Sequence, residues 1–446
     1  MGKEEDLRGN DWTRRSVLGA AAGGVVGLTI GKGQQARAQA VAPALGGKLT
    51  YWGGLIFSDD ANQLLQDTIN AWGEANGVET EVVMINQNET VQKVSAAVAS
   101  NTMPDAIDLN LDLLLPLSIQ GVFMPIDDLY DLVGKAQGGW YEGVDRASNT
   151  NAVAGGRTGL PFGVSGNLLL RRKDLLEPAG FKDAPATWDE LVQQAAAVNG
   201  NGVYGLGLAL SNVGDGNVQI NVLQSFGGRI ADDAGKKVTI KSEETRTYLQ
   251  WVKNAWDKGI FPPGNATWDG AGDNQAYLSG QAAFIANTGS VGVAAKTQDP
   301  ELYEGSAFSP LPAGPKGVIS PVTPQLRAIP KTSKNPEAAK ALLLHLSQPE
   351  FLNKYYKVAI YGPVLKGQRN LGAFTSTDPI LVALLGLAEK GTAPAYPDTY
   401  NAAYGELINN FIVPKMAQRV VIDGWNFDKA MDEAQTQAQG IYDKYK

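Results

Sequence analysis

Two hydrophobic periods alternate in the first part of the chain. Short apolar runs at residues 49–52, 81–85 and 104–107 are typical of buried strands. Between them, residues 59–76 and 89–100 place apolar side chains at helical spacing, on one face of each segment. The order strand, helix, strand, helix, strand predicts βαβ units and therefore an α/β fold with a mainly parallel sheet.

Polar and aromatic residues follow the ends of these predicted strands. Ligands of such sheets bind beyond the carboxyl ends of the strands. Residues at that edge are therefore candidates for a binding site: Trp52, Ser58, Asp59, Asn86, Asn110 and Asp112.

Predicted strands and helices alternate again in the second half of the chain. Thr187 to Glu190 has the sequence of a capping box and predicts a helix through residue 198. Apolar runs at 204–210 and 281–285 predict strands, and residues 242–258 predict a helix between them. We therefore expect a second α/β body.

Residues 160–176 read as one long strand between the two bodies. The stretch LPFGVSGNLLLRRKDLL has a small polar middle between apolar runs. Ser165 and Asn167 lie two residues apart, so a continuous strand would point both side chains to one side. We expect a hinge strand whose polar side chains form the floor of a cleft.

Composition excludes several classes of chemistry. The 446 residues include no cysteine and one histidine, His345, which sits mid-helix in a leucine-rich run. A transition-metal site or a Ser-His-Asp triad is therefore not expected, and no G-x-S-x-G or phosphate-loop motif occurs. The net charge of −8 argues against a nucleic-acid partner. We expect no cofactor; calcium binding by loops 212–217 and 269–274 is left open.

The N-terminus predicts export. Paired Arg14 and Arg15 precede a Gly/Ala-rich apolar run, and Ala38-Gln39-Ala40 offers a cleavage site of small residues. This is the pattern of a twin-arginine signal, here residues 1–40, cleaved near Ala40. The apolar run is too short to span a bilayer of about 30 Å. We therefore expect a soluble periplasmic protein.

Aromatic and hydrogen-bonding residues are frequent near predicted loop ends. Trp52, Trp140, Trp268 and Trp425 lie at such positions. A sugar offers an apolar C–H face and a ring of hydroxyls, which suit aromatic faces and Asp, Asn or Gln side chains respectively. The pattern is compatible with a sugar but does not by itself distinguish it from other small solutes.

A series of motifs resembles one family. They are KLTYW at 48–52, SNTMPD at 100–105, GVFMPIDDL at 121–129, LPF at 160–162, RKDLL at 172–176, PATWDEL at 185–191, GQAAF at 280–284 and NPEAAK at 335–340. Their order along nearly the whole chain after the signal resembles the extracellular solute-binding proteins of ABC importers. The resemblance is to the carbohydrate-binding group that includes maltose-binding protein.

The resemblance implies two α/β lobes joined by a multi-strand hinge, the two-lobed periplasmic-binding-protein fold. The expected N-terminal lobe is 41–166 plus 309–330, and the expected C-terminal lobe is 167–308 plus 331–446. Further crossings are expected near 306–312 and 328–334. The implied protein is a monomeric, non-enzymatic receptor that closes over a solute and docks on a permease with its ATPase.

The resemblance also implies site residues. By this resemblance, the sugar-contacting positions are Ser58, Asp59, Asn110 and Asp112 of the strand edge and Ser165 of the hinge. Leu109 and Ser290 stand where maltose-binding protein has tryptophan platforms. This favours a small sugar or polyol over a linear maltodextrin, with Trp52 and Trp268 as replacement stacking faces. A polyamine or organic anion is the alternative ligand, and a secreted glycosidase the alternative class. The remaining candidates are Asp215, Asn217, Asn287, Tyr361, Tyr400 and Tyr404.

Overall fold

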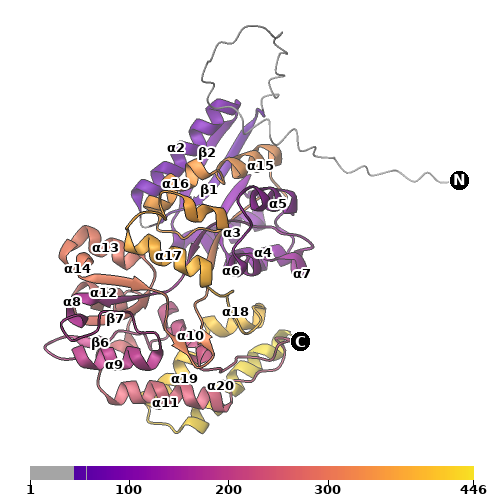
Figure 1. Ribbon diagram of the computed structural model, residues 1–446. Coiled ribbons are helices and arrows are strands. Elements are labelled where there is room, and N and C mark those ends of the chain that lie inside the picture. The colour runs from indigo at the N-terminus through magenta and orange to yellow at the C-terminus, as the bar shows by residue number, and fades with distance from the viewer. Residues whose placement is uncertain (1–44, 57, 446) are drawn as a thin grey trace.

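The first lobe is built on a five-stranded sheet (Figure 1). The computed structural model describes residues 45–56 and 58–445, so the signal predicted at the N-terminus lies outside the described residues. β1 (Lys48–Gly54) pairs in parallel with β2 (Glu79–Ile85) and β3 (Ala106–Asn110). β11 (Thr323–Ala328) runs antiparallel between β3 and β4 (Leu160–Ser165), so the sheet is mixed rather than mainly parallel.

Helices cover both faces of this sheet. Local sequence sets their ends: the Ser58 side chain caps the first of them, and Gly77 ends it with a φ of 67°, a value that favours glycine. The predicted helices at 59–76 and 89–100 are thereby confirmed. The first-lobe helices are α2 (Asp59–Asn76), α3 (Gln87–Ser100), α4 (Leu111–Ile119), α5 (Asp127–Ala136), α6 (Glu142–Ala147), α7 (Asn151–Ala154), α15 (Pro336–His345) and α16 (Pro349–Ala359).

The second lobe contains a four-stranded sheet in the order β6-β7-β5-β8. β6 (Tyr204–Leu206) and β7 (Ala282–Asn287) are parallel, whereas β5 (Leu168–Arg172) is antiparallel to both β7 and β8 (Ser306–Ser309). Strand β6 is shorter than the run predicted at 204–210. A short ribbon of β9 (Ala313–Gly314) and β10 (Gly317–Val318) lies apart from both sheets.

The second-lobe helices pack around this sheet and beneath it (Figure 1). The Thr187 side chain caps the helix predicted there, accepting a hydrogen bond from the Glu190 amide at 3.1 Å. The helices are α8 (Lys173–Leu176), α9 (Trp188–Val198), α10 (Val218–Ser225), α11 (Glu243–Asp257), α12 (Gly272–Leu278), α13 (Ser290–Gln298), α14 (Pro300–Glu304), α18 (Ala402–Asn409), α19 (Ile412–Val421) and α20 (Phe427–Tyr442).

The predicted hinge strand is two strands. β4 ends at Ser165 in the first sheet and β5 begins at Leu168 in the second, with Gly166 and Asn167 outside both. A Cβ added to Gly166 would lie 2.6 Å from the Pro321 carbonyl oxygen, so the chain passes too closely here for another residue. The crossing is as predicted, but the alternation of side chains does not continue through it.

The chain returns to the second lobe later than predicted. Residues 331–446 were assigned to the C-terminal lobe, but α15 and α16 share a buried cluster with α2 of the first lobe. Asp105 holds this segment there by accepting hydrogen bonds from the Ser333 hydroxyl and the Lys334 amide, each at 2.7 Å. The crossing predicted near 328–334 is therefore wrong. It occurs around α17 (Pro379–Lys390), which lies between the lobes (Figure 1).

The segment 309–330 also divides differently from the prediction. Its first part stays with the second lobe, because the Ala313 amide donates to the Ala186 carbonyl and the Lys316 amide to the Ser225 carbonyl. Only the part leading into β11 belongs to the first lobe. Within the described residues, no helix is long and apolar enough to cross a membrane.

Candidate functional site

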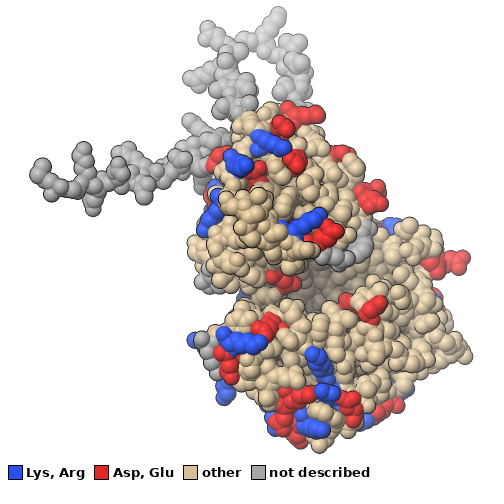
Figure 2. Space-filling model, turned by 180° about the vertical axis from the view of Figure 1, so that it is seen from behind, with Lys and Arg blue, Asp and Glu red and all other residues tan. Residues whose placement is uncertain are grey.

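A cavity of about 360 Å³ lies between the two lobes, where Figure 2 shows the surface hollowed. The first lobe supplies most of its wall, and the N-terminus of α13 supplies the second-lobe side. Five of the predicted site residues line it: Ser58, Asn110, Ser165, Ser290 and Tyr361.

Two helix caps of the first lobe border the cavity. Ser58 accepts a hydrogen bond from the Ala61 amide at 3.2 Å, and Asn110 accepts one from the Leu113 amide at 3.1 Å. Both caps follow β-strands of the first sheet, which is why the sequence places them at its carboxyl edge. Each side chain therefore has one oxygen committed to its helix and stands at the cavity wall.

The hinge supplies the floor. The Gln325 amide nitrogen donates to Ser165 Oγ at 3.3 Å, and that hydroxyl donates to the Thr323 carbonyl at 3.4 Å. All three residues line the cavity. Asn167, which was expected beside Ser165, is not among the lining residues, because the strand breaks at residues 166–167 and the side-chain alternation is lost.

Aromatic side chains form another part of the lining, called here the aromatic wall. Phe162 and Tyr361 meet edge to face, with ring centroids 6.0 Å apart and an interplanar angle of 86°. The ring centroids of Tyr355 and Tyr361 are 6.3 Å apart. Gly163 makes this possible, since an added Cβ would lie 2.8 Å from Cγ of Tyr361. Burial raises the pKa of the Tyr361 hydroxyl, and the nearby Asp108 carboxylate adds to this, so the ring stays neutral.

Asp108 is the acidic residue among the described residues that line the cavity. Arg327 Nε lies 3.3 Å from its Oδ1, and the Tyr51 hydroxyl donates to the same oxygen. Burial raises the pKa of the Asp108 carboxyl, while the Arg327 guanidinium and the Tyr51 hydroxyl act in the opposite direction. Arg327 itself is 0% exposed and lies 3.9 Å from the centre of the Phe162 ring, so it supports both the acidic and the aromatic wall from behind.

A polar chain leads from the cavity into the second lobe. The Ser290 and Thr288 hydroxyls are 2.7 Å apart, and Asn287 Oδ1 accepts a hydrogen bond from the Thr288 amide. Asn287 Nδ2 in turn donates to Asp273 Oδ2 at 2.7 Å. Asn287 therefore lies directly behind the lining residue Thr288. Its side chain binds the carboxylate of Asp273, which is 2% exposed.

Asp215 is electrostatically coupled to this chain. Burial raises the pKa of the Asp215 carboxyl, and the negative charge of Asp273 raises it further, to about 6. The two loops for which calcium binding was left open thus bring their acidic residues within electrostatic reach of each other. In the part of the chain that the structure describes, no group of three or more acidic, histidine or cysteine side chains forms a metal site.

Replacing Asp215 with Asn is expected to stabilise the protein above about pH 6. A carboxyl whose pKa is raised on folding opposes folding once it ionises, so the native state loses stability as the pH rises from about 4 to 6. After allowance for its partial exposure, the gain in the free energy of unfolding is about 1–2 kcal/mol at pH 8 and near zero at pH 4. Urea unfolding at both pH values measures it, and an equal gain at both would contradict it.

Several predicted site residues lie elsewhere. Trp52 packs against the cluster beneath α3 and α4, and Trp268 packs so closely on Gly272 that an added Cβ would lie 2.3 Å from its ring. Asp59 and Asn86 are exposed and do not line the cavity. Tyr404 is 3% exposed in the second-lobe core, because it occupies a buried position of the amphipathic helix α18.

Asp112 and Tyr400 contact each other rather than the cavity. The Tyr400 hydroxyl donates to Asp112 Oδ1, which joins α4 of the first lobe to the loop before α18. Asn217 also lies outside the cavity; its Nδ2 donates to the Ile408 carbonyl at 3.4 Å.

The sequence did not lead to three residues of the cavity lining: Phe162, Tyr355 and Asp108. Phe162 lies on the predicted hinge strand, three positions before Ser165, and its aromatic side chain was a usable signal. Tyr355 comes from α16, assigned beforehand to the other lobe. Asp108 falls inside a predicted strand, and its ion pair with a residue more than two hundred positions away has no local signal.

Comparison with known proteins places the chain in a family. The family described as "Bacterial extracellular solute-binding protein" matches residues 67–383, which is more than half of the chain. A Brucella abortus protein named as a binding protein is 23% identical over 328 residues, 73% of this chain and 78% of its own. A Sinorhizobium fredii protein, named "Probable amino-acid ABC transporter periplasmic-binding protein", is 23% identical over 63% of this chain and 65% of its own.

Solved structures show the same fold. The sugar-binding protein MalE of Xanthomonas citri superposes with a TM-score of 0.75 at 22% identity, covering 89% of this chain and 98% of that one. Maltose-bound MalE3 of T. maritima gives 0.73 at 21% identity, covering 89% and 100%. The predicted α/β fold with two lobes is therefore confirmed.

Proposed function

Because the chain belongs to the bacterial extracellular solute-binding proteins, we propose that it captures a sugar or polyol between its lobes and delivers it to an ABC permease. The family consists of binding receptors rather than enzymes, in agreement with the absence of a catalytic motif from the sequence. The proposal places the mature protein in the periplasm as a monomer, exported by the twin-arginine pathway.

The amphipathic lining of the cavity carries the proposal. The lining combines the aromatic rings of Phe162, Tyr355 and Tyr361 with hydroxyl, amide and carboxylate groups. A sugar ring combines the two matching kinds of surface, with C–H groups on its faces and hydroxyls at its edge. The volume of about 360 Å³ is at the small end of ligand sites, which supports a mono- or short oligosaccharide.

The charge of the lining supports a neutral solute. Among the described lining residues, Asp108 is the one acid and there is no Lys, Arg or His. Asp108 is already paired with Arg327, so the lining offers no side-chain cation to an anion and no cluster of carboxylates to a polyamine. An amino acid, which the name of the Sinorhizobium relative suggests as a second candidate, would leave its carboxylate without a cationic partner.

A thermal-shift panel tests the substrate class. Mature protein is melted with maltose, laminaribiose, tagatose, a set of monosaccharides, polyols, amino acids, polyamines and organic acids. A solute present at one hundred times its dissociation constant adds roughly 2.7 kcal/mol of stability. We expect the shift among the sugars or polyols; a shift confined to the charged solutes would overturn the assignment.

Replacing Tyr361 with Leu is expected to weaken sugar binding. The change keeps an apolar side chain but removes the aromatic face, and aromatic contacts contribute about 0.5–1.5 kcal/mol, or roughly 2- to 10-fold in the dissociation constant. Calorimetric titration with the sugar identified in the panel measures it. Tyr396→Leu is the control, because Tyr396 is 44% exposed outside the cavity. Equal affinities of the two variants would remove Tyr361 from the site.

A further inference from the structure

One hydrogen bond joins the two lobes beside the cavity. The Tyr400 hydroxyl, just before α18 of the second lobe, donates to Asp112 in the first turn of α4 of the first lobe. The neighbours of Asp112 on α4, Asn110 and Leu113, both line the cavity. The contact therefore lies at the rim of the cleft, where a change in the angle between the lobes would break it.

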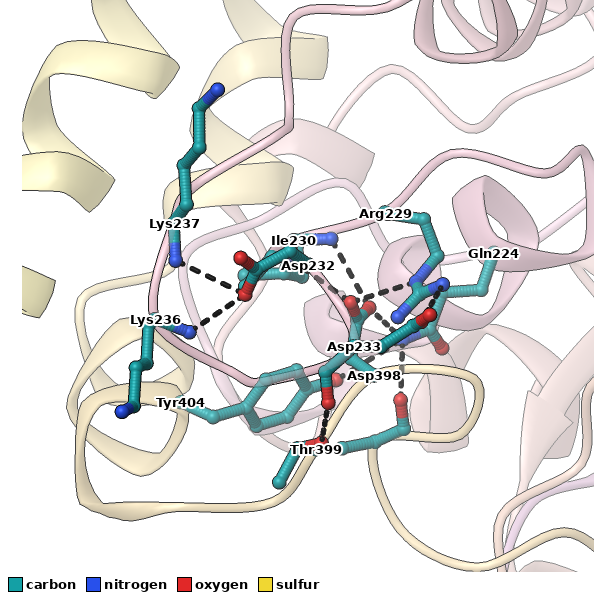
Figure 3. Close-up of polar contacts among 12 residues, drawn as sticks. Gln224, Arg229, Ile230, Asp232, Asp233, Lys236, Lys237, Asp398, Thr399 and Tyr404 are labelled. Atoms are coloured by element: carbon teal, nitrogen blue, oxygen red, sulfur yellow. Dashed lines mark hydrogen bonds and ion pairs between the residues drawn. The ribbon is translucent and has the colours of Figure 1, made fainter.

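The loop that carries Tyr400 is fixed to the second lobe through Asp398 (Figure 3). The Asp398 side chain is 0% exposed, although its loop crosses the surface. Two backbone amides and two side chains direct their hydrogens at it over 2.9–3.1 Å: those of Ile230, Ala231, Gln224 and Arg229.

The residues on either side of Tyr400 are fixed to the same second-lobe segment. The Thr399 hydroxyl donates to the Asp233 carbonyl at 3.1 Å (Figure 3). Asn401 Nδ2 donates to the Gly235 carbonyl at 2.9 Å. Tyr400 is therefore held from both sides before its hydroxyl reaches the other lobe. This leaves the loop little freedom to follow Asp112 if the lobes separate.

Asp112 is held equally firmly on the first lobe. The Asn110 cap fixes the start of α4, and Leu111 and Leu114 on either side of Asp112 are buried against the first sheet. The bond thus connects a residue held on each lobe, and a change in the angle between the lobes would lengthen or break it. Because Tyr400 and Asp112 belong to different lobes, their hydrogen bond constrains the lobes and not only one loop.

We propose that Tyr400 and Asp112 form a clasp that favours the lobe arrangement of this structure, called closed below, before the solute binds. A receptor whose binding-competent state is only partly populated has an apparent dissociation constant equal to the intrinsic constant divided by that fraction, so the clasp also tunes affinity. The clasp acts on the angle between the lobes and is independent of which solute the cavity takes.

The test measures lobe closure in the solute-free protein. Because the chain contains no cysteine, Ala71→Cys on α2 and Gln437→Cys on α20, both exposed, give one labelling site in each lobe. Single-molecule energy transfer between two dyes then reports the populations of closed and open molecules. Because Tyr400→Phe removes one hydrogen bond of ordinary strength, we expect it to lower the ratio of closed to open molecules roughly 2- to 10-fold.

Two further variants make the result specific. Tyr396→Phe removes a hydroxyl from the same loop at a position that is 44% exposed, and it should leave the ratio unchanged. In an Asp112→Ala background, Tyr400→Phe should have no further effect, since the partner is already absent. The proposal is overturned if Tyr400→Phe behaves like Tyr396→Phe, if its effect persists in the Asp112→Ala background, or if the parent protein has no closed population.

Discussion

Arg327→Met is expected to lower the free energy of unfolding by about 3–5 kcal/mol, the largest effect predicted for this protein. The guanidinium is wholly buried, pairs with Asp108, donates a hydrogen bond to the Tyr51 hydroxyl at 3.0 Å and covers the Phe162 ring. Methionine fills much of the space but leaves Asp108 as a buried carboxylate without its cation. Urea unfolding followed by circular dichroism measures the loss.

A matched control and a partial rescue separate charge from packing. Arg146→Met breaks the Arg146–Glu142 pair, whose side chains are 60% and 77% exposed, and should cost less than about 1 kcal/mol. Adding Asp108→Asn to Arg327→Met removes the unpaired negative charge of Asp108 and should recover part of the lost stability. An Arg327→Met loss as small as that of the control would show that the buried pair contributes little.

Asp398→Ala is expected to lower the free energy of unfolding by about 2–5 kcal/mol. The substitution leaves the amides of Ile230 and Ala231 buried without their acceptor, and each such group costs about 1–3 kcal/mol. It also releases the loop that carries Tyr400, so limited proteolysis should cut near residues 395–401 faster than in the parent protein. Thermal unfolding and proteolysis together measure the two consequences.

Asp233→Ala is the control for this prediction. Asp233 pairs with the same Arg229 at 3.1 Å, but its side chain is 96% exposed, whereas that of Asp398 is 0% exposed. Removing it should therefore change stability by less than about 1 kcal/mol. If both variants lost the same stability, the effect would belong to Arg229 and not to the backbone amides that Asp398 holds.

Local signals in the sequence predicted the elements well. The helix α2 begins and ends where the Ser58 cap and Gly77 require, and α9 begins at the Thr187 cap. These features depend on residues within one turn of each other, so the sequence alone contains the information. The same holds for Ser58 and Asn110, which reach the cavity because each caps a helix after a strand of the first sheet.

Long-range contacts decided what the sequence did not. Asp105 holds residues 333–335 on the first lobe, and with them α15 and α16, so the lobe boundary moved by a helix pair. Tyr404 had a plausible aromatic signal, yet its helix buries it in the second-lobe core. Asp112 and Tyr400 were each expected to contact the ligand, and the fold instead pairs them across 288 positions of sequence.

The sequence by itself therefore determined the fold class, the family resemblance and the two capping residues of the site, because periodicity, caps and ordered motifs are local. Only the tertiary structure decided that Phe162 and Tyr355 join Tyr361 in the aromatic wall. It alone also decided the buried Asp108–Arg327 pair, the break at residues 166–167 and the contact between Tyr400 and Asp112. Each of these depends on which distant segments share a surface. That depends on packing and on the pairing of buried charges, and no short stretch of sequence records it.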